Sequence, residues 1–206
     1  LMPPLRRLVK INEPLQMGMA ALSTIFNLYD EPAETDDGGI DLEGEINTVE
    51  FCRVSFNYQN SETDVLKEVS FKLEKEKMVA VVGTSGSGKT TIASLLLRFY
   101  DCNSGSILIN GIDVRKLSLK SLRKHIAYVP QDTFLFDGTI EENITYGYEG
   151  EISREKLQIA LEAAHVSEFT SRLKNGLDTR VGERGVKLSG GQRQRISIAR
   201  AIFKNA

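Results

Sequence analysis

The chain is poor in the residues that build metal sites and disulfides. Its 206 residues contain two cysteines, two histidines and no tryptophan. Cys52 and Cys102 form neither a metal-ligand spacing nor a CxxC pair, which favours two reduced, intracellular thiols over a disulfide. His125 and His165 lie in helix-like surroundings without candidate partner ligands, so we interpret both as structural. These residues therefore predict neither a metal site nor a disulfide.

Long apolar runs and a surplus of positive charge are also missing. No run of about 18 apolar residues occurs, and we find no signal peptide, so no segment is expected to span a bilayer by itself. A formal net charge of −2 weighs against nucleic acid as a partner. With 41% hydrophobic and 26% charged residues, the composition is that of one soluble globular domain with a short appendage.

The chain divides into three predicted parts. Residues 1–30 carry apolar side chains at alternating steps of four and three, which predicts a helix, and Pro14 predicts a kink or break in it. The stripe consists of Leu15, Met19, Leu22, Phe26 and Tyr29. We expect this helix to end a larger element, although packing on its own domain is an alternative. The acidic residues 31–45 predict a linker, and residues 46–206 predict the domain.

The early part of the domain is typical of strands. In residues 49–58 the alternation changes phase between Phe51 and Val54, residues 69–73 alternate, and residues 107–111 end in an Asn110 and Gly111 hairpin turn. Residues 78–83 (MVAVVG) do not alternate, which predicts a strand buried on both faces of a parallel sheet. Helical periodicity over residues 153–173 follows. This order predicts an α/β domain with a helical subdomain.

A glycine-rich loop follows the predicted buried strand. Residues 83–90 (GTSGSGKT) fit the phosphate-loop pattern GxxxxGK[ST], with a helix expected directly after them. Glycines let backbone N–H groups turn toward a phosphate, and the helix start adds its dipole. Lys89 would lie between the β- and γ-phosphates, and the Thr90 hydroxyl would bind Mg²⁺. The expected ATP-binding residues are Gly83, Thr84, Ser85, Gly86, Ser87, Gly88, Lys89, Thr90 and Thr91.

A second glycine-rich helix start occurs about a hundred residues later. Ser189 and Gln192 form the capping-box pattern, so they could simply cap a helix. Capping does not require Gly190 and Gly191, each of which costs up to about 1 kcal/mol relative to alanine in a helix. Bare glycines leave this helix start open to a close, negative group, and the outward face of a γ-phosphate fits that description. The spacing leaves open whether such a contact forms within one chain or between two.

These two motifs, together with YVPQDTFLFDGTIEENI (residues 128–144), resemble the nucleotide-binding domain of ABC transporters. The resemblance implies a P-loop NTPase of the ABC type, with an antiparallel β subdomain and a helical subdomain. It further implies that two such domains meet head to tail around each ATP. Tyr58 matches the aromatic residue that stacks on adenine, and Gln131 matches the glutamine that joins Mg²⁺ and the attacking water to the helical subdomain. Glu183 matches a segment that senses the membrane domain.

The amino-terminal part resembles the cytosolic end of the last transmembrane helix in exporters whose membrane and ATPase parts share one chain. The cations of LRRLVK (residues 5–10) agree with the positive-inside tendency. Residues 15–30 and 133–144 are most similar to bacterial lipid A flippases. The resemblance implies an ATP-driven exporter of lipid A or another hydrophobic substrate, in the inner membrane with this domain on the cytoplasmic side. Another multidrug or lipid exporter, or a soluble ABC-type ATPase acting on DNA or the ribosome, is the alternative.

Members of this family continue, beyond the point matching Ala206, into an apolar strand that ends in Asp and Glu, then an aspartate loop and a histidine. From the resemblance we expect the chain to be a piece lacking these groups, which hold Mg²⁺ and polarise the attacking water. Because positioning and charge carry most of phosphoryl transfer, the piece alone is expected to be inactive. The strand beside residues 78–83 would also be missing, so we expect poor solubility.

Overall fold

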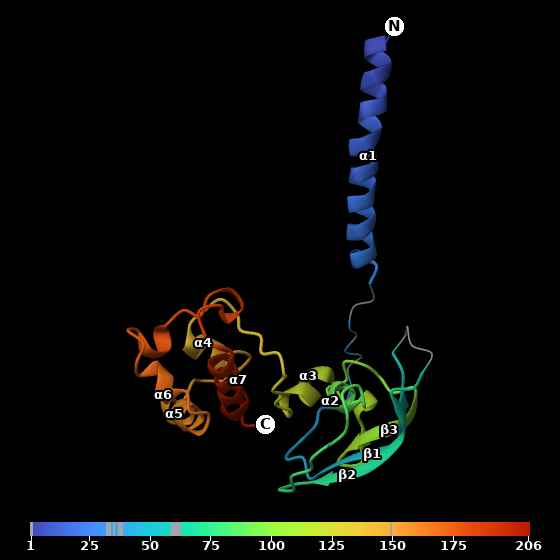
Figure 1. The fold of residues 1–206 in the computed structure, drawn as a ribbon. Helices are drawn as coiled ribbons and strands as arrows, with labels where there is room; N and C mark the ends of the chain where they lie inside the picture. The colour runs from blue at the N-terminus through green and yellow to red at the C-terminus, as the bar shows by residue number, and fades with distance from the viewer. Residues whose placement is uncertain (1, 32–33, 35, 37–38, 59–62, 149) are drawn as a thin grey trace. The chain divides into compact units, whose positions relative to one another are not determined.

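The computed structural model describes residues 2–31, 34, 36, 39–58, 63–148 and 150–206 (Figure 1). The chain forms two compact units, Leu1–Asp37 and Gly38–Ala206. Each unit is described by itself below.

The first unit is a single long helix, α1 (Met2–Tyr29), as the apolar stripe predicts. Of the kink or break predicted at Pro14, the break does not occur, because Pro14 lies inside one continuous helix. A proline removes one N–H donor, and here the helix continues beyond that loss. The five stripe side chains are exposed, the least of them, Leu22, by 53%. In the described part of the chain, no helix combines the length and the apolar character needed to cross a membrane.

The second unit contains a four-stranded antiparallel sheet of order β2-β1-β3-β4. Its strands are β1 (Thr48–Phe56), β2 (Leu66–Glu74), β3 (Ser104–Ile109) and β4 (Ile112–Asp113). The change of phase in β1 is confirmed, because both ladders of β1 shift register after Phe51 and Cys52, where Arg53 has φ 46°. Asn110 and Gly111 form the two-residue turn between β3 and β4, with φ values of 50° and 81°. Positive φ at both positions is typical of the primed hairpin turns.

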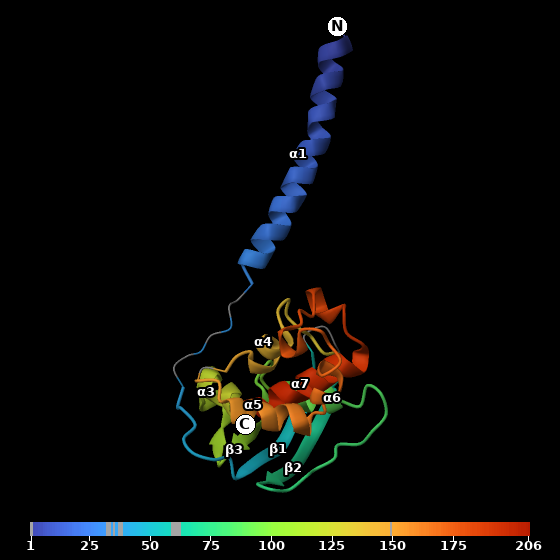
Figure 2. The same ribbon diagram turned by 90° about the vertical axis from the view of Figure 1, so that its left-hand side faces the viewer.

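The rest of this unit consists of helices and the loops that join them (Figures 1 and 2). The α-helices are α2 (Lys89–Leu96), α3 (Leu119–Lys124), α4 (Ile140–Thr145), α5 (Arg154–Ala163), α6 (Ser167–Thr170) and α7 (Gly190–Lys204). Short 3₁₀ helices are η1 (Val114–Lys116), η2 (Gly176–Asp178) and η3 (Glu183–Gly185). Cys52 and Cys102 are free thiols, as expected.

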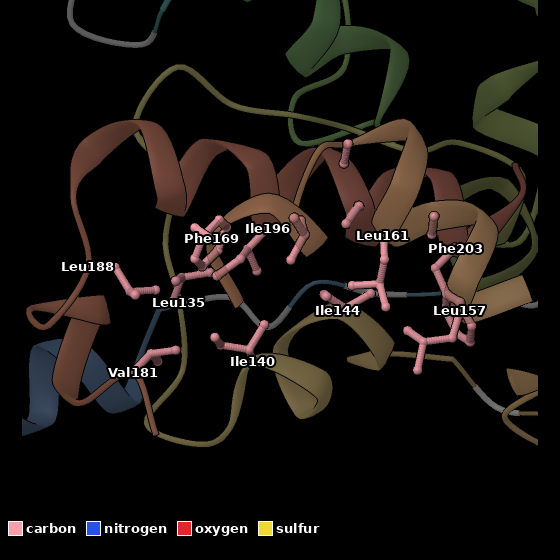
Figure 3. Packing of buried hydrophobic residues seen from close by; sticks show 14 residues of the cluster. Leu135, Ile140, Ile144, Leu157, Leu161, Phe169, Val181, Leu188, Ile196 and Phe203 are labelled. Carbon is pink, nitrogen blue, oxygen red and sulfur yellow. The ribbon is translucent and has the colours of Figure 1, made fainter. Parts of the chain in front are cut away.

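The unit contains two separate hydrophobic cores, each of which stabilises one part of it. The first joins the sheet to α2 and α3, with Phe51, Ile107 and Leu95 among its buried side chains. The second joins α4, α5, α6 and α7 with the loop residues Leu135, Val181 and Leu188, all labelled in Figure 3. Ile140 and Ile196, both fully buried, lie in this second core. The expected division into a β subdomain and a helical subdomain therefore has a physical basis in two cores.

Residues 78–83 do not form the buried strand that their apolar run predicts. They adopt no regular secondary structure, and Met78 and Val82 are 98% and 87% exposed. A parallel strand exists only through hydrogen bonds to a neighbouring strand. Among the described residues the sheet contains only the antiparallel strands β1 to β4, and none of them pairs with this segment. The prediction is wrong because the run had no strand to pair with.

The helical periodicity predicted over residues 153–173 is confirmed, because Leu157, Leu161, Ala164 and Phe169 are all buried, but it covers two helices. The structure has α5 and α6 there, separated at residues 164–166. His165 adopts φ 55°, and a left-handed residue ends a helix. Val166 then turns into the second core, where it is fully buried.

The last residues of the predicted linker lie on the domain. The amide of Ile40 donates to the Lys116 carbonyl at 2.7 Å, and the Ser118 amide donates back to the Ile40 carbonyl at 3.0 Å. The Leu42 amide donates to the Ser121 hydroxyl at 2.8 Å, and the Leu42 side chain is buried. Residues 40–42 are therefore attached to the start of α3.

We expect Gly39→Ala to loosen this attachment. An added Cβ would lie 2.5 Å from the Lys116 carbonyl oxygen and 2.7 Å from the Ser118 nitrogen, both of them rigid backbone atoms. Overpacking of this kind costs about 1–3 kcal/mol, which corresponds to roughly 5- to 150-fold faster hydrogen exchange of the Leu42 and Ser118 amides. Gly191→Ala is the control, because nothing lies within 4 Å of its added Cβ. Unchanged exchange in Gly39→Ala would contradict this reading.

Candidate nucleotide-binding site

The phosphate loop turns directly into α2, as its sequence pattern predicts. Gly88 is the N-cap residue of this helix with φ 85°, and Gly86 has φ 82°. These backbone conformations favour glycine, which has no Cβ to clash. At Gly88 a Cβ would also lie 2.6 Å from the Leu66 side chain at the start of β2. Two of the three motif glycines are thus required by local geometry.

The Lys89 ammonium is held by the loop itself. Its Nζ donates to the Gly83 carbonyl at 3.0 Å, to the Thr84 carbonyl at 2.6 Å and to the Ser87 hydroxyl at 3.3 Å. No carboxylate of the described residues forms an ion pair with it. The positive charge therefore stays at the loop and is not neutralised there, which suits an anionic ligand.

Tyr58 and Thr91 are brought together although they are 33 positions apart. The Tyr58 hydroxyl lies 3.1 Å from the Thr91 hydroxyl, and Thr91 is buried in the first turn of α2. The ring of Tyr58 makes edge contacts with Phe56 and Tyr100, with ring centroids 4.9 and 5.2 Å apart. An aromatic side chain thus lies beside the phosphate loop, where a base attached to the phosphates could reach it. Thr90 is exposed on the same helix.

Gln131 is exposed and, in the described part of the chain, its side chain makes no hydrogen bond. The loop after it is held by Asn143 of α4, which sequence reasoning missed. The Asn143 side chain accepts from the Phe136 amide at 2.9 Å and donates to the Phe136 and Thr139 carbonyls at 3.0 and 2.9 Å. A polar residue on the face shared by Ile140 and Ile144 was the available signal.

Arg200 of α7 completes this network and was also missed. Its guanidinium donates to the Asn143 backbone carbonyl at 2.7 Å and to the Asn143 side-chain oxygen at 3.2 Å. It also lies 5.9 Å from the ring centroids of Phe136 and Tyr146. Burial lowers the pKa of Arg200. Among the described residues, the Arg200 guanidinium pairs with carbonyl oxygens and aromatic rings and with no carboxylate. These contacts link α7 to the loop after Gln131.

The second glycine-rich helix start has both hydrogen bonds of a capping box. The Ser189 hydroxyl accepts from the Gln192 amide at 3.3 Å, and the Gln192 side chain accepts from the Ser189 amide at 2.9 Å. Capping thus accounts for Ser189 and Gln192. It does not account for the glycines, since a Cβ on Gly191 would meet nothing within 4 Å and one on Gly190 only the Arg193 guanidinium at 3.9 Å. Nothing in the described chain requires this surface to be bare.

The predicted site residues therefore form two groups. Residues 83–91 gather around the phosphate loop with Tyr58, and residues 189–192 form the start of α7. No hydrogen bond or ion pair among the described residues joins one group to the other. Gln131 stands alone between them in the sequence.

Comparisons with known proteins agree with these features. The family model described as "ABC transporter" matches residues 66–206. A solved structure of a bacterial Atm1-family ABC exporter with ATP bound matches with a TM-score of 0.81 and 41% identity, over 98% of this chain and 36% of that one. The expectation of an ABC-type ATPase fold is confirmed.

Curated relatives include ATP-dependent lipid A-core flippases. The protein of Coxiella burnetii is 49% identical over 98% of this chain and 34% of its own length. That of Vibrio cholerae is 48% identical over 100% of this chain and 35% of its own length. The chain thus spans about a third of the length of these relatives. With its phosphate loop, its capped glycine pair and these matches, the chain belongs to the ABC transporter family.

Proposed function

We propose that this chain is the ATP-binding part of an ATP-driven membrane exporter. The observation that carries the proposal is the bare start of α7, where Gly190 and Gly191 are free of any steric requirement within the described chain. A helix N-terminus without side chains suits the face of a terminal phosphate that a phosphate loop leaves open. Two such helix starts in one domain are explained if both act on the same triphosphate.

The residues then take separate roles. The glycines and backbone N–H groups of residues 83–88 surround the inner phosphates, and Lys89 supplies a positive charge at the β- and γ-phosphates. Tyr58 offers its ring to the adenine. Ser189, Gly190 and Gly191 approach the γ-phosphate from a second copy of the chain, with Gln192 fixing Ser189. Charge and position at the γ-phosphate are what phosphoryl transfer needs from a protein.

Thr90 and Gln131 are the proposed protein ligands of Mg²⁺. A hydroxyl and an amide oxygen are hard donors of the kind that Mg²⁺ accepts alongside phosphate oxygens. Both side chains are exposed, and the described residues contain no group of three His, Cys, Asp or Glu side chains that would compete for the ion. Bound Mg²⁺ would neutralise charge that develops on the phosphates. Gln131 precedes the loop that Asn143 and Arg200 hold. Binding of Mg²⁺ at Gln131 would therefore change the position of this loop and of the helical subdomain attached to it.

For the whole protein we propose a homodimer in the inner membrane, with this domain on the cytoplasmic side and a membrane domain in the same chain. ATP binding would close two domains head to tail, and hydrolysis would reset them. The proposed cargo is lipid A or a similar lipid, supported by 44–49% identity to lipid A-core flippases. Nucleic acid is not a proposed partner. Another exporter type, such as the Atm1 family, is the second candidate, supported by the 41% identity of its solved member.

The 206 residues expressed alone are proposed to be inactive and poorly soluble. Met78 and Val82 expose an apolar segment directly before the phosphate loop, without a pairing strand among the described residues. An unpaired apolar segment favours association between copies.

The head-to-tail arrangement can be tested by cross-linking. We expect full-length protein with Cys52→Ser and Cys102→Ser to form a cross-linked dimer when one tagged copy carries Ser85→Cys and the other carries Ser189→Cys. A short bifunctional maleimide and a non-hydrolysable ATP analogue would be added, and the dimer would be measured on a denaturing gel. Both substitutions keep a small side chain, and Ser85 is exposed.

The controls decide between a contact within one chain and a contact between two. Mixing two copies that both carry Ser85→Cys should give no dimer. If the double variant Ser85→Cys with Ser189→Cys gives only internally cross-linked monomer, the two groups meet within one chain and the proposal is wrong. Stimulation of ATP hydrolysis by lipid A, but not by other lipids, would separate the flippase from the second candidate.

A further inference from the structure

Tyr58 belongs to an aromatic cluster with a member that no motif singles out. Tyr100 follows α2 in the sequence and lies with its ring centroid 5.2 Å from that of Tyr58, at an interplanar angle of 89°. Phe56, the last residue of β1, makes a similar edge contact with Tyr58 at 84°. Tyr100 also contacts Phe56, with ring centroids 5.6 Å apart. Three rings from two distant segments therefore support one another.

The ring of Tyr58 depends on these contacts for its position. Tyr58 lies beyond the end of β1, so no ladder hydrogen bond of the sheet fixes its backbone. Its hydroxyl is tied to Thr91 of α2, and its ring meets Phe56 and Tyr100 edge-on. Among the described residues no aromatic ring stacks on Tyr58, which is only partly buried. Edge-to-face contacts hold an aromatic ring in one orientation without covering it by stacking.

We propose that Tyr100 is a positioning residue of the nucleotide site, which holds the ring of Tyr58 in the orientation that stacks on a purine base. The inference rests on the proposed function, in which the phosphate loop binds ATP. Tyr100 is 48% exposed, so it does not belong to the buried core that supports the fold. Its effect on binding should therefore depend on the base and not on the phosphates.

The test compares two ligands of the full-length protein by titration calorimetry in the presence of Mg²⁺. AMP-PNP carries both base and phosphates, whereas inorganic tripolyphosphate carries phosphates alone. We expect Tyr100→Leu to weaken AMP-PNP binding about 2- to 10-fold, the range of an aromatic pair, and to leave tripolyphosphate binding unchanged. Tyr100→Phe keeps the ring and should bind AMP-PNP as the unsubstituted protein does.

A double-mutant cycle adds a result that general destabilisation would not produce. Tyr58→Ala should weaken AMP-PNP binding about 5- to 100-fold, because it removes the stacking ring. Adding Tyr100→Leu to Tyr58→Ala should cause no further loss, since the ring that Tyr100 positions is gone. Equal weakening of both ligands by Tyr100→Leu, no weakening of AMP-PNP, or additive losses in the double variant would each overturn the inference. Failure of the unsubstituted protein to bind either ligand would instead overturn the proposed function.

Discussion

Lys89→Ala is expected to lower the rate of ATP hydrolysis by the full-length protein about 10²- to 10³-fold, the range found when one preorganised donor to the transition state is removed. The ammonium is placed by three hydrogen bonds to the Gly83, Thr84 and Ser87 positions of its own loop. These bonds hold the charge where the terminal phosphates would lie. Phosphate release at saturating ATP measures the rate.

Lys77→Ala serves as the matched control for charge. Lys77 is exposed, lies a few residues before the phosphate loop, and makes no side-chain hydrogen bond or ion pair among the described residues. We expect its removal to leave hydrolysis within about twofold of the unsubstituted protein, as for most surface substitutions. Hydrolysis by Lys89→Ala at an undiminished rate would show that the phosphate loop is not where the reaction takes place.

Gly191→Ala should separate stability from activity. Alanine is better than glycine in a helix by up to about 1 kcal/mol, and the added Cβ meets nothing within 4 Å, so the domain should become slightly more stable. The same methyl group would stand on the surface that approaches the γ-phosphate in the proposed dimer. Because displacement by about 1 Å can cost about 10²-fold in rate, hydrolysis should fall by about that factor. Thermal unfolding and phosphate release on the same preparation measure the two effects.

Gly18→Ala in α1 is the control for helix propensity. Its added Cβ also meets nothing within 4 Å, and it lies outside the proposed site. We expect hydrolysis to stay near normal in this variant. If Gly191→Ala gains stability and keeps full activity, the bare start of α7 faces nothing during hydrolysis, and the head-to-tail arrangement loses its main support.

Local features of the fold could be predicted well from the sequence. The hairpin at Asn110 and Gly111, the glycine N-cap of α2 and the capping box at Ser189 all occur as expected. Each depends on a few neighbouring residues, because φ preferences and side-chain caps act within one turn. The predictions that failed concern contacts between segments far apart in the sequence. Residues 78–83 have strand character, but among the described residues they have no pairing strand. The helical periodicity of residues 153–173 also did not show that the segment divides into α5 and α6, where Val166 enters a core.

The sequence by itself determined the family, the phosphate loop and the second glycine-rich helix start, since these are contiguous motifs whose chemistry is local. Only the tertiary structure decided that Tyr58 meets Thr91 and Tyr100, that Asn143 and Arg200 hold the loop after Gln131, and that Gly39 must pass against the backbone near Lys116. These pairs lie 33, 42, 57 and 77 positions apart. Contacts at such separations arise when folding brings segments together, and no short pattern in the chain encodes which side chains then meet.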